Sequence, residues 1–499
     1  MKYLFLLFSL TLSFALQGQS FLDPAFGIGG IVIMPEDVPM ASNGWLKSLV
    51  IQSDHKILAA GHRGGMGIVA RYKDYGSLDS SFATNGIFTT DYHSIINVTA
   101  IQPDGKILAE GSYQGALEDS ALTIRLNTDG SLDNTFGTNG RVHTGFAHGR
   151  SVGYAIALQP DNKIVIARAA YSNFVGFARL LPNGVPDSSF CDSGRVMING
   201  FAGVAYGLGI MPDGRIASGG GQYFGYKFMA IRLLTNGRPD TSFNHVGYAG
   251  VNAGYTDNLA HAMVMQADGK IIIAGSGWYG TQGDNFTAVR YDTNGHLDPT
   301  YGDTGVVNVD FYGDNDSPYG IALTTDGKLL MTGRAAQASV PVFVTTRINN
   351  NGIIDNTFGV GGRLTTNVGN YKDVGLAITQ QPDGKVLVSG SSNQAAPNYS
   401  EMTLLRYTPY PDIISTVNTN NHFVGLYPNP ASNKLQVSEP ERVLSINAYD
   451  MLGRAIEIGY VPHSRAIQLP ELRDGMYLFT VSFDDHTSLT QSIRILNTQ

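Results

Sequence analysis

The chain has little charge, one cysteine and one long apolar run. Charged residues make up 15% of the 499 residues, and the formal net charge is −8. Because no basic block occurs, the composition argues against nucleic acid as a partner. The single cysteine, Cys191, excludes a disulfide framework within the chain and a zinc site built on cysteines. Helical periodicity is also lacking, so we expect the 43% of apolar residues to form an all-β core.

The long apolar run lies at the N-terminus. Tyr3 to Leu16 follows the basic Lys2 and is shorter than the roughly 20 residues of a membrane span. A basic start before a short apolar stretch is typical of a secretory signal. We therefore expect residues 1–19 to be a signal peptide, with cleavage near Gly18. We also expect no transmembrane segment in the mature chain. The alternative interpretation of the apolar run is a buried N-terminal strand or helix.

Three short motifs each recur seven times between Leu22 and Tyr407. The first motif is an aspartate, usually preceded by Leu, that stands three residues before a Phe or, in one copy, before Tyr301. The second is a turn of the type Asp-Gly-Lys, which is altered in some copies. The third is an arginine at the end of a short apolar strand. The aspartates recur at steps of 53 to 58 residues, which indicates one repeated unit. The aspartates are Asp23, Asp79, Asp133, Asp187, Asp240, Asp298 and Asp355; the turns begin at Asp54, Asp104, Asp161, Asp213, Asp268, Asp326 and Asp383; the arginines are Arg71, Arg125, Arg179, Arg232, Arg290, Arg347 and Arg406.

Each unit contains four short apolar segments separated by Gly-rich turns, which is typical of a propeller blade. We predict a seven-bladed β-propeller of four-stranded blades over residues 20–410. The first unit opens with a copy of the aspartate motif at Leu22 and a strand, Gly30 to Met34, whereas the last unit stops at Tyr407 without them. Pairing the two ends would close the ring and remove open sheet edges. An open solenoid is the alternative.

These units resemble the delta-60 repeat of bacterial proteins, a propeller-forming motif. The resemblance covers Leu22 to Tyr407, about three quarters of the chain. It implies the architecture, and it carries no defined activity for any residue.

The repeat period stops after a polar segment that we interpret as a linker, residues 411–421. Short alternating runs between Lys434 and Ile495 predict a small β-sandwich over residues 422–499. Three strings there, beginning at Tyr427, Tyr449 and Leu472, closely resemble the type A C-terminal sorting domain of the type IX secretion system. The resemblance implies routing by the type IX machinery to the outside of the cell or its surface, with cleavage of the tail. The alternative is an unrelated sandwich-type binding domain.

Few residues suggest chemistry. Asp310, Asp314 and Asp316 lie close together in the sequence and could hold calcium, although a solvated acidic loop is the other interpretation. A nucleophile-elbow pattern at Gly149 and a dinucleotide fingerprint at Gly275 both lack the helix that such sites require. We expect no other cofactor. The repeated arginines and aspartates could form a charged ring around the channel, but we expect each pair to make a structural bidentate contact.

The connections on one face of the predicted propeller vary in length and carry aromatic residues. Variable loops on a rigid scaffold are where binding usually occurs, and Tyr and Trp offer large contact area. We therefore predict a secreted or surface-attached binding or adhesion module for a glycan or protein partner. The alternatives are an extracellular hydrolase or lyase with its site in the central depression, and a structural protein whose aromatics pack the loops. The candidate ligand-binding residues are Trp278 and Tyr279 in the loop Gly275–Asn285, with Tyr113, Tyr171, Tyr223, Tyr226 and Tyr312.

Overall fold

The chain forms two compact units, Met1–Pro409 and Tyr410–Gln499, in the computed structural model. The predicted signal peptide and linker, and the candidates Tyr171 and Tyr223, lie outside the residues that the structure describes. Those residues are 21–34, 43–115, 119–143, 145, 151–170, 174–222, 225–254, 256–337, 340–394, 400–408, 426–427, 434–437, 443–450, 454–462, 464–473, 475–483 and 488–495.

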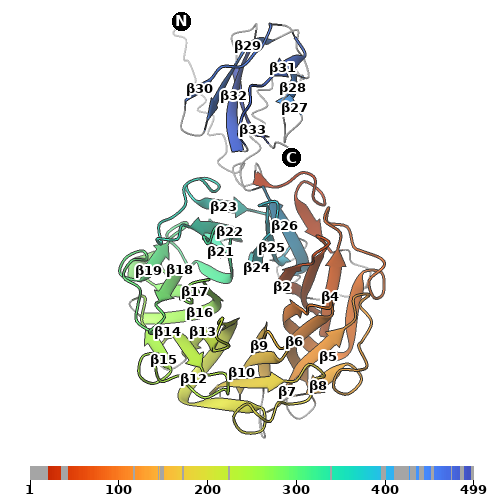
Figure 1. The fold of residues 1–499 in the computed structure, drawn as a ribbon, viewed down its shortest axis with the longest axis vertical. Helices are drawn as coiled ribbons and strands as arrows, with labels where there is room; N and C mark the ends of the chain where they lie inside the picture. The colour runs from red at the N-terminus through yellow and green to blue at the C-terminus, as the bar shows by residue number, and fades with distance from the viewer. Residues whose placement is uncertain are drawn as a thin grey trace, which may run out of the picture. The chain divides into compact units, whose positions relative to one another are not determined.

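The strands of the first unit form successive antiparallel sheets around a central axis (Figure 1). We number the blades along the chain, and each contains four strands from the innermost to the outermost. Blade 1 is β2 (Gly44–Ile51), β3 (Ile57–Arg63), β4 (Met66–Tyr72) and the first part of β5 (Ile87–Ile101); blade 2 is the second part of β5, β6 (Ile107–Gln114), β7 (Asp119–Leu126) and β8 (Arg141–His143); blade 3 is β9 (Val152–Leu158), β10 (Ile164–Ala170), β11 (Phe174–Leu180) and the first part of β12 (Arg195–Ile210). Blade 4 is the second part of β12, β13 (Ile216–Gln222), β14 (Lys227–Leu233) and β15 (Tyr248–Val251); blade 5 is β16 (Thr256–Met265), β17 (Ile271–Trp278), β18 (Asp284–Tyr291) and β19 (Val306–Val309); blade 6 is β20 (Ser317–Leu323), β21 (Leu329–Gln337), β22 (Val340–Ile348) and β23 (Arg363–Thr366); blade 7 is β24 (Asp373–Gln380), β25 (Val386–Ser392), β26 (Glu401–Tyr407) and β1 (Ile31–Ile33).

Two strands each belong to two blades. β5 pairs with β4 through its first half and with β6 from Ser94 onward, and β12 does the same with β11 and β13. The sequence pattern predicts a short first strand in blade 2, Val98 to Gln102, whereas β5 begins at Ile87. No glycine or proline interrupts the stretch from Ile87 to Ile101, so the chain stays extended from one blade into the next.

The N-terminal strand closes the ring. β1 pairs with β26, with Ile31 opposite Leu405 and Ile33 opposite Thr403. The displaced N-terminal segment therefore supplies the outermost strand of blade 7. β26 is therefore paired on both sides, and β1 forms the outer edge of blade 7.

The core lies between neighbouring blades. Leu58 and Phe82 of blade 1 pack with Ile107 and Leu122 of blade 2, and all four are buried. Because the second and third strands of a blade are covered on both faces, they read as continuous apolar runs and not as alternating ones. Among the described residues, no helix is long and apolar enough to cross a membrane.

The second unit consists of two sheets around one core. The three-stranded sheet has the order β27-β28-β31, and the four-stranded sheet has the order β30-β29-β32-β33. Leu435 and Ile467 of the first sheet share a buried cluster with Phe479 and Ile493 of the second, as the predicted β-sandwich requires. The strands are β27 (Leu426–Tyr427), β28 (Lys434–Val437), β29 (Val443–Asp450), β30 (Ala455–Ile456), β31 (Ala466–Gln468), β32 (Gly475–Phe483) and β33 (Ser488–Ile495).

Candidate functional site

The three repeated motifs meet in one buried ion cluster in each blade. In blade 1, Arg71 Nε lies 2.8 Å from Asp79 Oδ2, and Lys56 Nζ lies 3.4 Å from the same oxygen. Arg71 Nη1 donates to the backbone oxygen of Thr128 in blade 2 at 2.6 Å. The guanidinium also covers the ring of Phe82 at 4.6 Å. The cluster therefore fixes a turn of one blade against the next blade.

The predicted structural pairing of arginine and aspartate is present in all seven blades, but it is not bidentate. Arginine Nε contacts one carboxylate oxygen at 2.7–2.9 Å, and the other oxygen accepts backbone and hydroxyl hydrogen bonds such as those of Ser81. The basic residue of the Asp-Gly-Lys turn, which the sequence interpretation left out, is the third member of the cluster. The pairs are Arg71–Asp79, Arg125–Asp133, Arg179–Asp187, Arg232–Asp240, Arg290–Asp298, Arg347–Asp355 and Arg406–Asp23.

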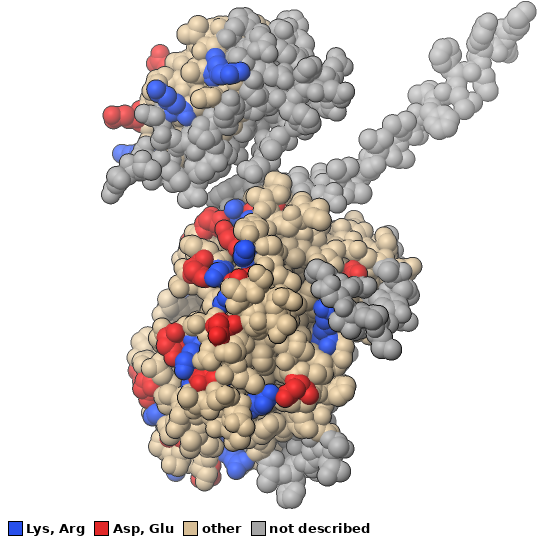
Figure 2. Space-filling model, turned by 90° about the vertical axis from the view of Figure 1, so that its right-hand side faces the viewer, with Lys and Arg blue, Asp and Glu red and all other residues tan. Residues whose placement is uncertain are grey.

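The aspartates of these clusters are strongly ionised. Burial raises the pKa of Asp187, but hydrogen bonds from Ser189 and the charge of Arg179 outweigh it and hold the pKa at about 2. Figure 2 shows one side of the molecule, on which acidic and basic side chains lie next to each other. Because each cluster arginine lies against an aspartate, the clusters stabilise the blades and do not present a ring of unpaired charge to a ligand.

The described aromatic candidates lie in the second-to-third-strand connections and in the link between blades 5 and 6. The structure does not bring them together in one site. Tyr113 is the last but one residue of β6 in blade 2 and packs edge-on against Tyr92 at 5.1 Å. Tyr226 precedes β14 in blade 4 and is 44% exposed. Tyr312 follows β19 of blade 5, is 41% exposed and shares a 2.9 Å hydrogen bond with Thr365.

Trp278 and Tyr279 lie in a shorter loop than the sequence predicts. Trp278 is the last residue of β17 and pairs with Asp284, so the connection contains only residues 279–283 and includes one 3-10 turn. Trp278 is 38% exposed, whereas Tyr279 is half-buried and donates a 2.6 Å hydrogen bond from Oη to the backbone oxygen of Ala253. The glycines are compatible with this ordered turn because Gly280 and Gly283 have positive φ.

The acidic loop before β20 uses its carboxylates to bind its own backbone. Asp310, Asp314 and Asp316 each accept a hydrogen bond of 2.7–2.8 Å from a backbone N–H group within the loop. Over the described ranges, no group of three or more His, Cys, Asp or Glu side chains is placed to hold a metal ion. Burial and the charges of Asp310 and Asp314 raise the pKa of Asp316 to about 7.

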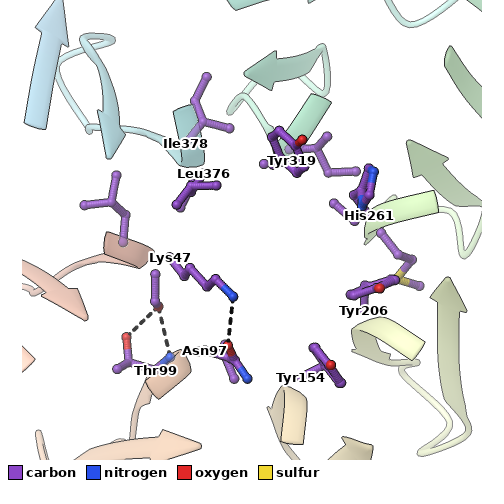
Figure 3. Close-up of a pocket in the computed structure, with 17 residues that line it drawn as sticks. Lys47, Asn97, Thr99, Tyr154, Tyr206, His261, Tyr319, Leu376 and Ile378 are labelled. Carbon is purple, nitrogen blue, oxygen red and sulfur yellow. Dashed lines mark hydrogen bonds between the residues drawn. The ribbon is translucent and has the colours of Figure 1, made fainter. Parts of the chain in front are cut away.

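The innermost strand of every blade carries a β-bulge at the same position. At each bulge the pairing with the second strand shifts by one residue, which re-aims one side chain. These side chains point into a common central space (Figure 3). We call them the bulge ring: Lys47, Asn97, Tyr154, Tyr206, His261, Tyr319 and Leu376.

A glycine on the second strand makes room for the bulge in six of the seven blades. A Cβ on Gly61 would lie 1.8 Å from the backbone oxygen of Trp45, and Gly111, Gly220, Gly275, Gly333 and Gly390 show the same close approach. Blade 3 differs, because Arg168 takes this position and pairs with Gly153 of the first strand. The missing side chain of Gly153 leaves space for Glu110 of blade 2, whose carboxylate lies 4.0 Å from Arg168 Nε in the interior.

The bulge ring lines a cavity of about 570 Å³. One side is an aromatic arc of four consecutive blades, with ring-centroid distances of 5.2 Å for Tyr154–Tyr206, 6.2 Å for Tyr206–His261 and 4.9 Å for His261–Tyr319. On the other side, Lys47 Nζ lies 3.4 Å from Asn97 Oδ1. The cavity therefore offers flat apolar faces opposite a small polar group.

Two basic side chains, Lys47 and His261, line the cavity. None of the described residues that line it is acidic. Burial lowers the pKa of Lys47. Burial and the nearby charge of Arg334 lower the pKa of His261 to about 4, so its imidazole is neutral at neutral pH. Lys47 is thus the one amine of the bulge ring.

None of the seven bulge-ring residues is among the candidates that the sequence pattern suggests. The alternation of polar and apolar residues along a strand does not predict where a bulge occurs. A signal was nevertheless present: each ring residue stands five positions before the residue that opens the next turn, such as Gln52 or Gln102. When the seven repeats are aligned, the residue at this position is charged in one copy and an amide, an aromatic or an apolar residue in the others.

Two family models match the chain. The model of the secretion system C-terminal sorting domain matches residues 425–495. The model of the domain of unknown function (DUF5122) β-propeller matches residues 102–136, 159–190, 266–301 and 324–358. The chain combines a delta-60-type β-propeller with a type IX sorting domain. The resemblance drawn from its motifs is confirmed, and the sorting domain indicates a protein that is secreted or attached to the outer cell surface through the type IX machinery.

Several solved structures are similar to the propeller. Catalytically inactive virginiamycin B lyase from Staphylococcus aureus with quinupristin has 10% identity and a TM-score of 0.45, over 75% of this chain and 99% of that one. Drosophila Plexin A in complex with Semaphorin 1b has 9% identity and a TM-score of 0.42, over 76% and 86%. A polysaccharide lyase, ulvan lyase, with bound saccharide has 10% identity and a TM-score of 0.42, over 74% and 95%. No curated protein matches the chain.

Proposed function

We propose that the exported propeller is a binding module for a glycan and that the glycan enters the central cavity. The observation that carries this proposal is the aromatic arc of Tyr154, Tyr206, His261 and Tyr319. Sugar rings have apolar faces that stack on aromatic side chains, and a few polar groups then fix their orientation. The Lys47–Asn97 pair supplies those polar groups on the opposite side.

The size of the cavity supports a small ligand or the end of a chain. Its volume of about 570 Å³ falls in the range of roughly 300–1,000 Å³ that is usual for small-molecule sites. A protein partner would instead need a broad surface. The exposed Trp278, Tyr226 and Tyr312 could supply such a surface only as separate contacts, because they belong to different blades or links.

A lyase acting in the same cavity is the second candidate. The observation behind it is the contact between the imidazole of His261 and the phenol of Tyr319, although a pKa of about 4 makes this imidazole a weak base. Hydrolysis is less well supported, since glycosidases commonly use two carboxyl groups and the described lining residues include none.

Binding of the purified chain to a panel of oligosaccharides, measured by calorimetry, tests the proposal. We expect Tyr206→Ala to weaken binding of any saccharide that the wild type retains by about 10-fold or more. Tyr75→Ala removes an exposed tyrosine from a turn outside the cavity and should leave affinity unchanged. Loss of binding in Trp278→Ala but not in Tyr206→Ala would move the site to the loop face. New double bonds in the recovered saccharide would identify the lyase.

A further inference from the structure

Lys47 is a half-buried amine that lines the cavity and has no acidic partner among the described residues. Its Nζ contacts Asn97 Oδ1 at 3.4 Å and lies 5.7 Å from the ring centre of Trp45. A buried charge that lacks a counter-charge is costly, and proteins usually pair or neutralise it. Burial accordingly lowers the pKa of Lys47, and an anion bound beside its amine would favour the charged form.

Lysines that stabilise the blades elsewhere in the chain have acidic partners. Lys106 and Lys328, in the repeated turns, lie 2.8 Å and 2.7 Å from the aspartates of their own blades. Lys47 occupies the bulge position instead, where no blade supplies an aspartate or glutamate. A role in stabilising the blades does not explain its charge.

Further positive charge lies close to the same cavity. Arg334 of blade 6 acts on His261 and also lowers the pKa of Lys372 through its charge, although burial contributes most to that shift. Over the described residues, neither Arg334 nor Lys372 takes part in an ion pair. Arg334 is thus close enough to His261 for its charge to act on a residue of the bulge ring.

Lys47 and the aromatic arc lie on different sides of one cavity (Figure 3). From this arrangement we propose that the ligand is an acidic saccharide, whose carboxylate or sulfate binds Lys47 beside Asn97 while its sugar ring stacks on Tyr206 and His261. This inference rests on the proposed function, because the aromatic arc is the reason for expecting a sugar. It adds the charge of the ligand and the residue that recognises it.

The experiment compares acidic saccharides with their neutral counterparts. The probes are uronic-acid oligosaccharides before and after reduction of their carboxyl groups, and sulfated oligosaccharides before and after desulfation. We expect the purified chain to bind at least one acidic probe about 10- to 100-fold more tightly than its neutral counterpart, as for a hydrogen bond to a charged group. Comparable affinity for both members of every pair would overturn the inference and leave the proposed function intact. Binding to none of the probes would overturn both.

Lys47→Met tests the residue itself. The variant should lose the preference for the acidic probe while its melting temperature stays equal to that of the wild type or rises, because an unpaired buried charge is removed. Lys227→Met, at the start of β14, removes a lysine that forms no ion pair over the described residues and should bind like the wild type. An unchanged preference in Lys47→Met would exclude Lys47 as the anion site. If that variant does not fold, the comparison of paired probes on the wild type still decides the charge of the ligand.

Discussion

Arg406 Nε lies 2.8 Å from Asp23 Oδ2, although 383 positions separate the two residues. In the other six blades the same contact joins residues eight positions apart. Blade 7 thus completes its ion cluster with a residue from the opposite end of the repeat array. The contact lies next to the pairing of β1 with β26 and ties the N-terminal segment to the ring.

Asp23→Asn should therefore open the ring at this junction. Removing one partner of a buried ion pair costs roughly 3–5 kcal/mol, and the N-terminal strand would also lose its anchor. Asp187→Asn breaks the equivalent contact inside blade 3 and is the matched control. Both variants should melt earlier, but only Asp23→Asn should make residues 21–34 accessible to limited proteolysis. Equal protection of the N-terminus in both would contradict closure by this contact.

Stability should depend on pH through Asp316. The folded protein holds its proton more tightly than the unfolded chain, because the folded pKa is about 7 and the ordinary value is 3.8. The free energy of unfolding therefore falls as pH rises from about 4 to about 7. Asp316→Asn, which mimics the protonated form, should be more stable than the wild type at pH 8, by about 1–3 kcal/mol, and similar to it at pH 4. Thermal melts across this range measure the effect.

Calcium provides a second measurement on the same loop. The carboxylates of Asp310, Asp314 and Asp316 already accept backbone hydrogen bonds, so we expect millimolar calcium to leave the melting temperature of the wild type unchanged at pH 8. A rise that is absent in Asp316→Asn would instead establish a calcium site there.

Trp278 and Tyr279 should differ in their effect on stability. Tyr279→Phe removes the hydrogen bond to Ala253 and should cost about 1 kcal/mol, and Tyr279→Ala should cost more because ring packing is lost as well. Trp278→Ala should cost less than Tyr279→Ala, since its side chain is the more exposed. Chemical denaturation of the three variants provides the comparison, and the reverse order would show that Trp278 is the packing residue.

The tail should determine export. Deleting residues 422–499 removes the sorting domain matched at 425–495, so the propeller should accumulate in the periplasm. Cell fractionation detects this, and circular dichroism of the retained protein shows whether the propeller remains folded. Normal appearance of the truncated chain outside the cell would contradict routing by this domain.

The sequence predicts the architecture because the repeated motifs perform the same physical task in each blade. Turn glycines, arginine–aspartate pairs and buried strands recur with a fixed order, and this order also reveals the displaced segment at Leu22. The sandwich strands follow from ordinary alternation, as between Lys434 and Val437. The bulge ring could not be found in this way, because a bulge interrupts the alternation on which strand prediction depends. The continuous β5 was missed for a related reason, since one strand serves two sheets.

The bulges separate the side chains that line the cavity from the residues that hold the blades together. Each blade presents one side chain to the centre from the same backbone position, while its ion cluster and its core lie elsewhere in the blade. A substitution at Lys47, Tyr206 or Leu376 therefore changes one sector of the wall and its contacts with the neighbouring ring residues, but none of the ion clusters that join the blades. Because the seven positions lie in separate repeats, substitutions can change the lining of the cavity one position at a time, in evolution or by design.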